Sequence, residues 1–342
     1  MNSLPGTPAS IEEIREVQIE LTEFCDADCA FCINRASFAK ERRSQHGLPT
    51  RSVEKILAWV AEAGIARVRF TGGEPLLRRD LLHLVEFARR AGLVTGVNTN
   101  GHFPDRLSEV ASAADFILLS FVSADSERTD AIFRRRGSHA LKLRALSRIT
   151  AHDNLWVSTV IQRSNIGELL EIGALLVRFH VKKWILLRPE DNGRGETGDE
   201  FGEREIDQLI AAAPALWGLG IDIGLGNAVP VCAARDSDGQ RILAALLRAG
   251  DGGMVSEGRS KLVIDPSGRV LCHYGIDAPL GQALGDLREL WQHPAAAKMR
   301  DASNLPNQCT SCEHLGVCLG GSRIAARAAY GTYAAPDPLM PR

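Results

Sequence analysis

Short β-branched or apolar runs alternate with longer amphipathic runs from Arg15 to about Pro189. This alternation is typical of repeated βα units, in which parallel strands form a sheet covered by helices. Six units predict an α/β fold, an open and partial version of the eight-unit barrel. We expect its strands at Val17–Leu21, Arg67–Phe70, Val94–Asn98, Phe116–Ser120, Trp156–Ile161 and Lys183–Leu187. We expect its helices at Ser52–Ala63, Asp80–Ala91, Ser138–Thr150 and Ile166–Phe179.

The second half of the chain has a weaker periodicity. A Gly- and charge-rich stretch, Asp191–Glu196, precedes an amphipathic pattern near Arg204–Ala213, which predicts a helix that ends at Pro214. Lys261–Ile264 and Arg269–His273 flank Asp-Pro-Ser-Gly, a strong turn sequence, so we expect a β-hairpin there. A length of 342 residues suits one large domain with a smaller one. We predict an N-terminal extension (1–14), a barrel (15–225) and a small C-terminal domain (226–342).

The composition is that of an ordinary globular protein. Apolar residues make up 45% of the chain, charged residues 24%, and the formal net charge is -2. Nothing in this balance indicates a nucleic-acid or membrane partner. Met1–Ser10 has no basic leader or apolar core, and no stretch approaches the roughly 18 apolar residues of a membrane span, so we expect a cytoplasmic protein. In that compartment, eight cysteines indicate metal ligation or redox chemistry rather than disulfides.

The residues that could carry chemistry follow the predicted strands. Cys25 comes after the first strand, Thr71-Gly72-Gly73-Glu74-Pro75 after the second, and Thr99-Asn100-Gly101 after the third, while Arg188 closes the sixth. In parallel barrels the reactive groups lie at the carboxyl ends of the strands. We therefore expect these segments to meet in one site.

Three cysteines share the first loop, as Cys25-x3-Cys29-x2-Cys32. Three thiolates can hold three irons of a cubane cluster and leave the fourth iron without a protein ligand. The alternative is a structural zinc site, but zinc usually takes a fourth close ligand, and neither His nor Cys follows within the loop. The spacing alone leaves both interpretations open.

The cysteine trio, with Phe31 just before its last member, resembles the radical S-adenosylmethionine (SAM) superfamily. Gly72-Gly73-Glu74-Pro75 resembles the GGEP element of that family, whose backbone and carboxylate receive the amino group of SAM. The chemistry is sound, because an ammonium group seeks an anionic acceptor and adjacent glycines let the backbone approach closely. The resemblance implies a partial (β/α)6 TIM-like barrel.

The resemblance also implies further SAM contacts. Phe31 matches a residue beside the adenine, Asn98 and Asn100 match a polar site on the third strand, and Ser120 matches a ribose contact. Each could instead be a local cap or a core filler. Arg134, in the run Arg134-Arg135-Arg136, resembles an arginine that meets the SAM carboxylate, although a solvated charged face is the competing explanation. Arg188 could bind a carboxylate or substrate.

The activity that the family implies is the reductive cleavage of SAM. One electron, delivered by an external reductant such as flavodoxin or ferredoxin, passes from a [4Fe–4S] cluster to SAM. The products are methionine and a 5′-deoxyadenosyl radical, which abstracts a hydrogen atom from a substrate carbon. The protein binds, orients and shields this cofactor chemistry.

The C-terminal half resembles the SPASM or twitch extension of that family, which holds auxiliary iron–sulfur clusters. The resemblance lies in the hairpin that ends at Cys272 and in Cys309-x2-Cys312-x5-Cys318, which Gly320-Gly321 follow. Cysteines of a full SPASM domain are missing at Ser322, near Ser256 and further toward the C-terminus, so we expect one auxiliary cluster.

The expected ligands of this cluster are Cys272, Cys309, Cys312 and Cys318, and Cys232 could replace any of them. A zinc site is the alternative. A spare Cys232 would be a buried filler or a catalytic hydrogen-atom donor.

For the substrate we expect a small molecule. About fifteen residues precede the barrel, too few for the leader-recognition domain that many peptide-modifying members carry. The predicted target is a hydroxyl-bearing carbon of a sugar, aminocyclitol or nucleoside in natural-product biosynthesis. Dehydrogenation, epimerisation and elimination or decarboxylation stay open, so the enzyme would be an oxidoreductase, epimerase or lyase. The alternatives are a maturase of a ribosomal peptide and, from another class, a non-catalytic metal-binding or electron-transfer protein.

Overall fold

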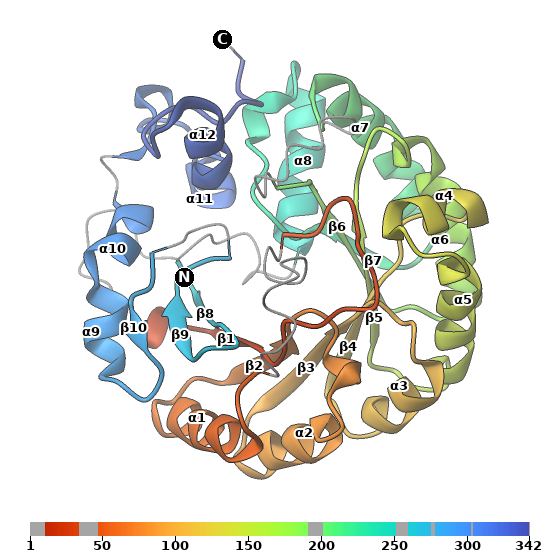
Figure 1. Ribbon diagram of the computed structural model, residues 1–342. Coiled ribbons are helices and arrows are strands. Elements are labelled where there is room, and N and C mark those ends of the chain that lie inside the picture. The colour runs from red at the N-terminus through yellow and green to blue at the C-terminus, as the bar shows by residue number, and fades with distance from the viewer. Residues whose placement is uncertain are drawn as a thin grey trace.

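A computed structural model describes residues 11–33, 47–190, 201–250, 259–274, 278–301 and 304–341. Its strands are β1 (Glu16–Glu20), β2 (Arg67–Thr71), β3 (Val94–Thr99), β4 (Phe116–Ser120), β5 (Leu155–Val160), β6 (Lys183–Leu187), β7 (Asp222–Leu225), β8 (Lys261–Ile264), β9 (Arg269–Leu271) and β10 (Gly281–Gln282). Within the described part of the chain they form one sheet in the order β10-β9-β8-β1-β2-β3-β4-β5-β6-β7 (Figure 1). Strands from β8 through β1 to β7 run parallel, whereas β9 and β10 are antiparallel additions.

Helices cover the outer face of the curved sheet (Figure 1). Those of the barrel are α1 (Thr50–Glu62), α2 (Leu81–Arg90), α3 (Pro104–Ala111), α4 (Ser126–Phe133), α5 (Ser138–Ile149), α6 (Leu169–Arg178), α7 (Glu203–Trp217) and α8 (Ser237–Ala249). The C-terminal part adds α9 (Leu287–Gln292), α10 (Pro294–Arg300), α11 (Leu315–Cys318) and α12 (Arg323–Tyr330). Short 3-10 turns are η1 (Ile11–Glu13), η4 (Pro75–Leu77), η5 (Ile166–Glu168), η6 (Val231–Ala233) and η8 (Asn307–Cys309).

The first strand shows why the barrel interior is a cavity rather than a packed core. Along β1, Val17 and Ile19 join the apolar core between sheet and helices, while Gln18 and Glu20 line the cavity. Strands of a parallel sheet that is covered on both faces are usually apolar throughout. Polar side chains on the inner face of β1 therefore mark a place that a ligand fills.

The structure confirms the α/β fold and the six predicted strands, each bound lying within one residue of its prediction. The hairpin also forms, as β8 and β9. The prediction for the helix before residue 214 is wrong, because α7 continues through Pro214 to Trp217. Proline removes one helical hydrogen bond, but the last turn buries Leu216 in the core, which compensates for that loss. The stretch Asp191–Glu196 and the position Ser256 lie outside the described residues.

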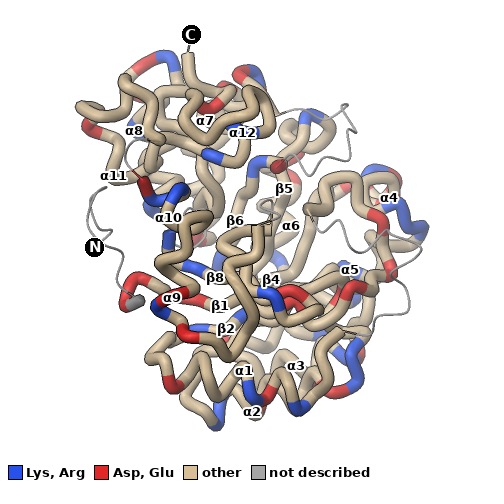
Figure 2. Tube along the Cα trace, turned by 60° about the vertical axis from the view of Figure 1, so that its left-hand side comes forward, with Lys and Arg blue, Asp and Glu red and all other residues tan. Residues whose placement is uncertain are grey.

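The C-terminal part shares its sheet and core with the barrel. Strand β8 pairs with β1, so the sheet continues across the predicted domain boundary. Cys272, Trp291 and Ile324 belong to the same apolar cluster as the barrel strands. Helices α11 and α12 lie beside α8 in both views (Figures 1 and 2), and α11 contacts α8. The division into three segments stays a prediction.

Charged residues of both signs alternate along the outer helices (Figure 2). Within the described ranges, none of the helices combines the length and the apolar character that crossing a membrane requires.

Candidate active site

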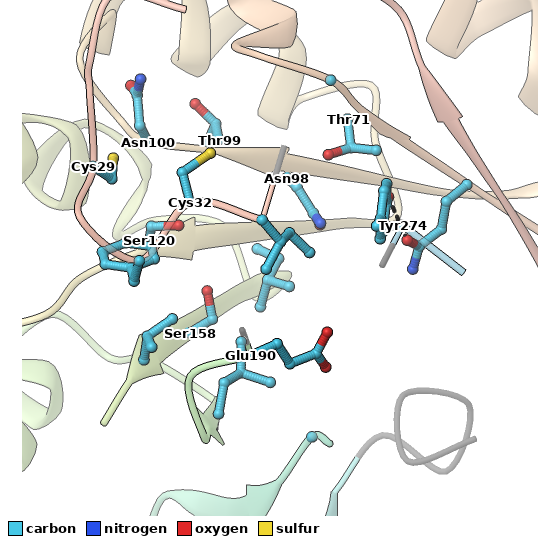
Figure 3. A pocket seen from close by; sticks show the side chains of 18 of the residues that line it. Cys29, Cys32, Thr71, Asn98, Thr99, Asn100, Ser120, Ser158, Glu190 and Tyr274 are labelled. Carbon is cyan, nitrogen blue, oxygen red and sulfur yellow. Dashed lines mark hydrogen bonds between the residues drawn. The ribbon is translucent and has the colours of Figure 1, made fainter. Parts of the chain in front are cut away.

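A cavity of about 250 Å³ opens at the carboxyl ends of the barrel strands. Residues of the cysteine loop, the turn after β2, the ends of β3 to β6 and the hairpin segment all line it (Figure 3). Of the predicted site residues, the cavity brings together Cys25, Cys29, Phe31, Cys32, Gly72, Gly73, Glu74, Asn98, Asn100, Ser120 and Arg188.

The cysteine loop is held against α4. The backbone N–H groups of Asp28 and Ala30 donate to the carbonyls of Phe133 (3.2 Å) and Ile132 (3.0 Å). Figure 3 shows Cys29 and Cys32 beside the end of β3. Burial raises the pKa of the Cys25 thiol to about 12 and also raises the pKa of Cys29, and the neighbouring thiols add to both shifts. Such thiols release their protons to solvent when they bind a metal, because the positive charge of the metal reverses these shifts.

The Gly72-Gly73 turn packs directly on this loop. The N–H groups of Gly73 and Glu74 donate to the carbonyls of Thr22 (2.7 Å) and Phe24 (2.6 Å). A Cβ at Gly73 would lie 2.0 Å from the Phe24 oxygen, and Gly72 has a φ of +135°. Only glycine fits both positions, so these glycines place the cysteine loop relative to β2.

The Glu74 carboxylate is buried and joins β2 to β3. Its Oε1 accepts from the Leu76 N–H (3.0 Å) and the Thr99 hydroxyl (2.8 Å), and Oε2 accepts from the Asn100 N–H (2.8 Å). Burial raises its pKa to about 7 in spite of these donors. A carboxylate can accept about four hydrogen bonds, so one acceptor site is left for a ligand.

Of the other predicted SAM contacts, some line the cavity and others lie outside it. Asn98 Oδ1 is buried at the cavity without a partner among the described residues. Phe31 packs edge-on against Phe133 with 5.7 Å between ring centres. Pro75 begins the buried turn η4 outside the cavity lining. Arg134 also lies outside that lining and forms an ion pair with Asp28 at 3.5 Å, so the structure does not place it for a SAM carboxylate.

Arg188 lies at the cavity, but its guanidinium already has partners. It donates to Asp337 Oδ2 (2.8 Å) and to the Ala228 carbonyl (3.1 Å), and both side chains of the ion pair are buried. This pairing ties the mouth of β6 to the C-terminal segment. A role in binding a substrate carboxylate stays a prediction.

Sequence reasoning missed a buried cation behind the cysteines. Lys142 Nζ donates to the carbonyls of Asn100 and Ser120 and lies 3.5 Å from the ring centre of Phe133. Burial lowers its pKa to about 7, and nearby Cys29 opposes that shift. Nothing in the helical pattern of α5 distinguishes this lysine from an exposed one.

A second missed group surrounds Asp26. Its carboxylate accepts from Asn100 Nδ2 (2.7 Å), contacts His102 Nδ1 (2.8 Å) and pairs with Arg135 (3.0 Å). These contacts hold the cysteine loop to the end of β3. Asp26 directly follows Cys25, and this position is the only feature of the sequence that could have indicated its place in the site.

The wall away from the cysteines is polar. Glu190 and Tyr274 reach it from the end of β6 and from the segment after β9 (Figure 3). The Tyr274 hydroxyl donates to Gln18 Oε1 (2.5 Å), and His273 Nε2 lies 3.6 Å from Glu190. Burial raises the pKa of nearby Glu20 to about 8. This wall offers donors, acceptors and charge to a substrate.

The remaining cysteines separate into two places. Cys232, Cys309, Cys312 and Cys318 line a second cavity of about 280 Å³. Cys272 is not among its lining residues and is fully buried in the main apolar core. The structure therefore does not support Cys272 as the fourth auxiliary ligand. Cys232 is not among the residues that line the barrel cavity, and its role as a hydrogen-atom donor stays a prediction.

A parallel barrel that gathers three cysteines and a glycine-rich turn at the carboxyl ends of its strands defines a class, the barrel enzymes that hold an iron–sulfur cluster. Comparison with known proteins gives the family. The model of the Radical SAM superfamily matches residues 19–176. The PqqA peptide cyclase of Ruegeria pomeroyi is 30% identical over 94% of this chain and 86% of its own length, and that of Gluconobacter oxydans 29% over 98% and 91%. The chain belongs to the radical SAM superfamily.

A solved structure shares the fold. SuiB of Streptococcus suis, bound to S-adenosylmethionine, aligns with a TM-score of 0.74 at 16% identity, over 96% of this chain and 77% of that one. The cofactors of this superfamily are a [4Fe–4S] cluster and SAM. The residues present fit both, because three thiols share the cavity with the buried Glu74 carboxylate and with an Asn98 oxygen that has no partner among the described residues.

The expectation of a sugar, aminocyclitol or nucleoside substrate is wrong. The relatives that match almost the whole chain are named for a peptide substrate, and SuiB has also been solved with its precursor peptide SuiA. The expectation came from the short segment ahead of the barrel. The length of that segment says nothing about what the cavity binds.

Proposed function

We propose that this chain is a radical SAM maturase that modifies a ribosomally made peptide, with cyclisation of the peptide as the reaction. The observation that supports it most is the match, over 94–98% of the chain, to relatives named PqqA peptide cyclase. The polar wall around Glu190 and Tyr274 suits a peptide, because it presents both donors and acceptors to backbone and side-chain groups.

The residues divide the work along the cavity. Cys25, Cys29 and Cys32 would hold the cluster, while Glu74 and Asn98 would orient SAM. With both cofactors bound, one-electron cleavage of SAM supplies a 5′-deoxyadenosyl radical that removes a hydrogen atom from the peptide. An external reductant such as flavodoxin or ferredoxin provides the electron. Ring closure then releases a second hydrogen as a proton and an electron, and an auxiliary cluster would accept that electron. The wall of the cavity would shield this chemistry from water and hold the target carbon in place.

The test is an anaerobic assay of the reconstituted protein with SAM, dithionite and peptides encoded by short genes beside its own. We expect 5′-deoxyadenosine to form faster with one such peptide, together with a SAM-dependent change in the mass of that peptide. The control is a variant with Cys25, Cys29 and Cys32 changed to Ala, which should form neither product. If none of the encoded peptides increases 5′-deoxyadenosine or changes in mass, the proposal is wrong.

A further inference from the structure

The second cavity joins two parts of the chain that are distant in sequence. Cys309, Cys312 and Cys318 come from η8, the following turn and α11, whereas Cys232 belongs to η6, after the last barrel strand. We propose that these four cysteines hold the auxiliary iron–sulfur cluster, with Cys232 as the fourth ligand in place of Cys272. The assignment does not depend on the identity of the substrate.

Local structure presents the three C-terminal thiols to one space. The Cys312 N–H donates to the Cys309 carbonyl (3.2 Å), and the Gly321 N–H donates to the Cys318 carbonyl (2.9 Å). Gly320, at a φ of +80°, leaves room here, because a Cβ would lie 2.8 Å from Leu305 and 3.8 Å from the Cys309 sulfur. The turn is thus shaped around the sulfurs.

Cys232 is positioned by the barrel. It lies in η6, a turn that follows Pro230 and precedes α8, and α8 contacts α11. Its sulfur is close enough to interact electrostatically with Cys318, Cys309 and Cys312. Cys272 has none of these neighbours, and the charge that acts on it is Arg300. Cys232 therefore lies near Cys309, Cys312 and Cys318, whereas Cys272 does not.

The space between the sulfurs suits a cluster better than zinc. A zinc ion draws four sulfurs to about 2.3 Å from one point. Here the thiols surround about 280 Å³, with Leu315 and Met340 on the same wall. In a [4Fe–4S] cluster each cysteine binds a different iron, so the sulfurs stand further apart.

The test uses the full chain with Cys25, Cys29 and Cys32 changed to Ala, so that any iron belongs to the auxiliary site. Cys232→Ala and the matched control Cys272→Ala are added separately, followed by anaerobic reconstitution with iron and sulfide. We expect Cys232→Ala to lose most of the iron and sulfide, as Cys309→Ala does, and Cys272→Ala to keep both. Elemental analysis, visible absorption and electron paramagnetic resonance (EPR) of the reduced protein report the result.

Two further measurements keep the outcome clear. Cys232→Asp, which keeps an anionic ligand, should retain iron with a changed EPR signal, and circular dichroism separates ligand loss from unfolding. In a chain that keeps Cys25, Cys29 and Cys32, Cys232→Ala should leave the spectrum of the SAM cluster in place. Iron lost from Cys272→Ala but kept by Cys232→Ala would overturn the assignment, and so would zinc in place of iron in the anaerobically purified protein.

Discussion

Glu74 is buried, yet its carboxylate accepts hydrogen bonds from the Leu76 and Asn100 N–H groups and from Thr99. These donors stabilise the ionised form, while burial raises the pKa to about 7. The group is therefore poised between two states at neutral pH. A bound ammonium would favour the ionised one.

Glu74→Gln should weaken SAM binding by about 10- to 100-fold, because a hydrogen bond to a charged group contributes about 1.5–3 kcal/mol. The affinity of the native protein should rise with pH as Glu74 loses its proton, and the affinity of the variant should not. Anaerobic calorimetry between about pH 5.5 and pH 6.5 checks both, because an α-amino group with a pKa of about 7.7–8.0 stays protonated in that range. Equal dissociation constants, or a flat native profile, would contradict this role.

Burial lowers the pKa of Lys142 to about 7, while Cys29 and Cys25 nearby favour its charged form, so a bound anionic cluster would keep this lysine protonated. Lys142→Met should make the reduction potential of the SAM cluster more negative, because the added electron would lose a compensating charge. A redox titration followed by EPR measures the shift. An unchanged potential would mean that the lysine is neutral in the loaded protein.

Sequence alone could not predict these roles. The cysteine trio and the Gly-Gly-Glu-Pro turn can be identified from the sequence, because their residues lie close together along the chain. Lys142, Asp26 and His102 act through neighbours from other βα units, and that proximity exists only once the barrel has formed. The choice of Cys232 over Cys272 has the same origin, because it depends on where the segment after β7 lies.

At the scale of elements, the turn between β2 and η4 controls the cysteine loop. Gly73→Ala would place a methyl group 2.0 Å from the Phe24 carbonyl oxygen, so the loop must move. We expect a loss of about 1–3 kcal/mol in the free energy of unfolding, and less iron at the SAM cluster. Gly167→Ala is the matched control, because no atom lies within 4 Å of its Cβ. Urea unfolding and iron analysis of the two variants make the comparison, and equal behaviour would exclude the steric role.

The strands were the easiest elements to predict, because each is a short apolar run between amphipathic helices. Strand β7 was not predicted, because its Asp222–Leu225 run is short and contains a glycine. The pairing of β8 with β1 was not predicted either. The hydrophobic pattern of a strand predicts which of its residues are buried. It does not predict which strand pairs with it.

At the scale of the whole molecule, the buried pair Arg188–Asp337 fastens the C-terminal segment to the barrel. Asp337 also accepts from the Ser322 N–H (2.6 Å) and the Leu339 N–H (2.9 Å), so it organises the end of the chain. Arg188, the other member of this ion pair, lines the barrel cavity. The pair therefore links the substrate cavity to the segment that holds the second group of cysteines.

Asp337→Asn should cost about 3–5 kcal/mol, because it leaves the Arg188 charge buried without its partner. Hydrogen exchange should show reduced protection in residues 304–341. The exposed pair Arg241–Asp238 supplies the control, since Asp238→Asn should cost about 0–1 kcal/mol. If the two variants lost similar amounts of unfolding free energy, the buried pair would not stabilise the contact between the C-terminal segment and the barrel.

The pairing of β1 with β8 has a consequence for biosynthesis. On the ribosome, β1 and its cysteine loop emerge early, but the strand that completes one side of β1 follows only after the whole barrel. The nascent chain must keep that edge from pairing elsewhere until translation is nearly finished. Until β8 pairs, β1 is supported by β2 alone, so the loop that bears Cys25, Cys29 and Cys32 reaches its final position at a late step of folding.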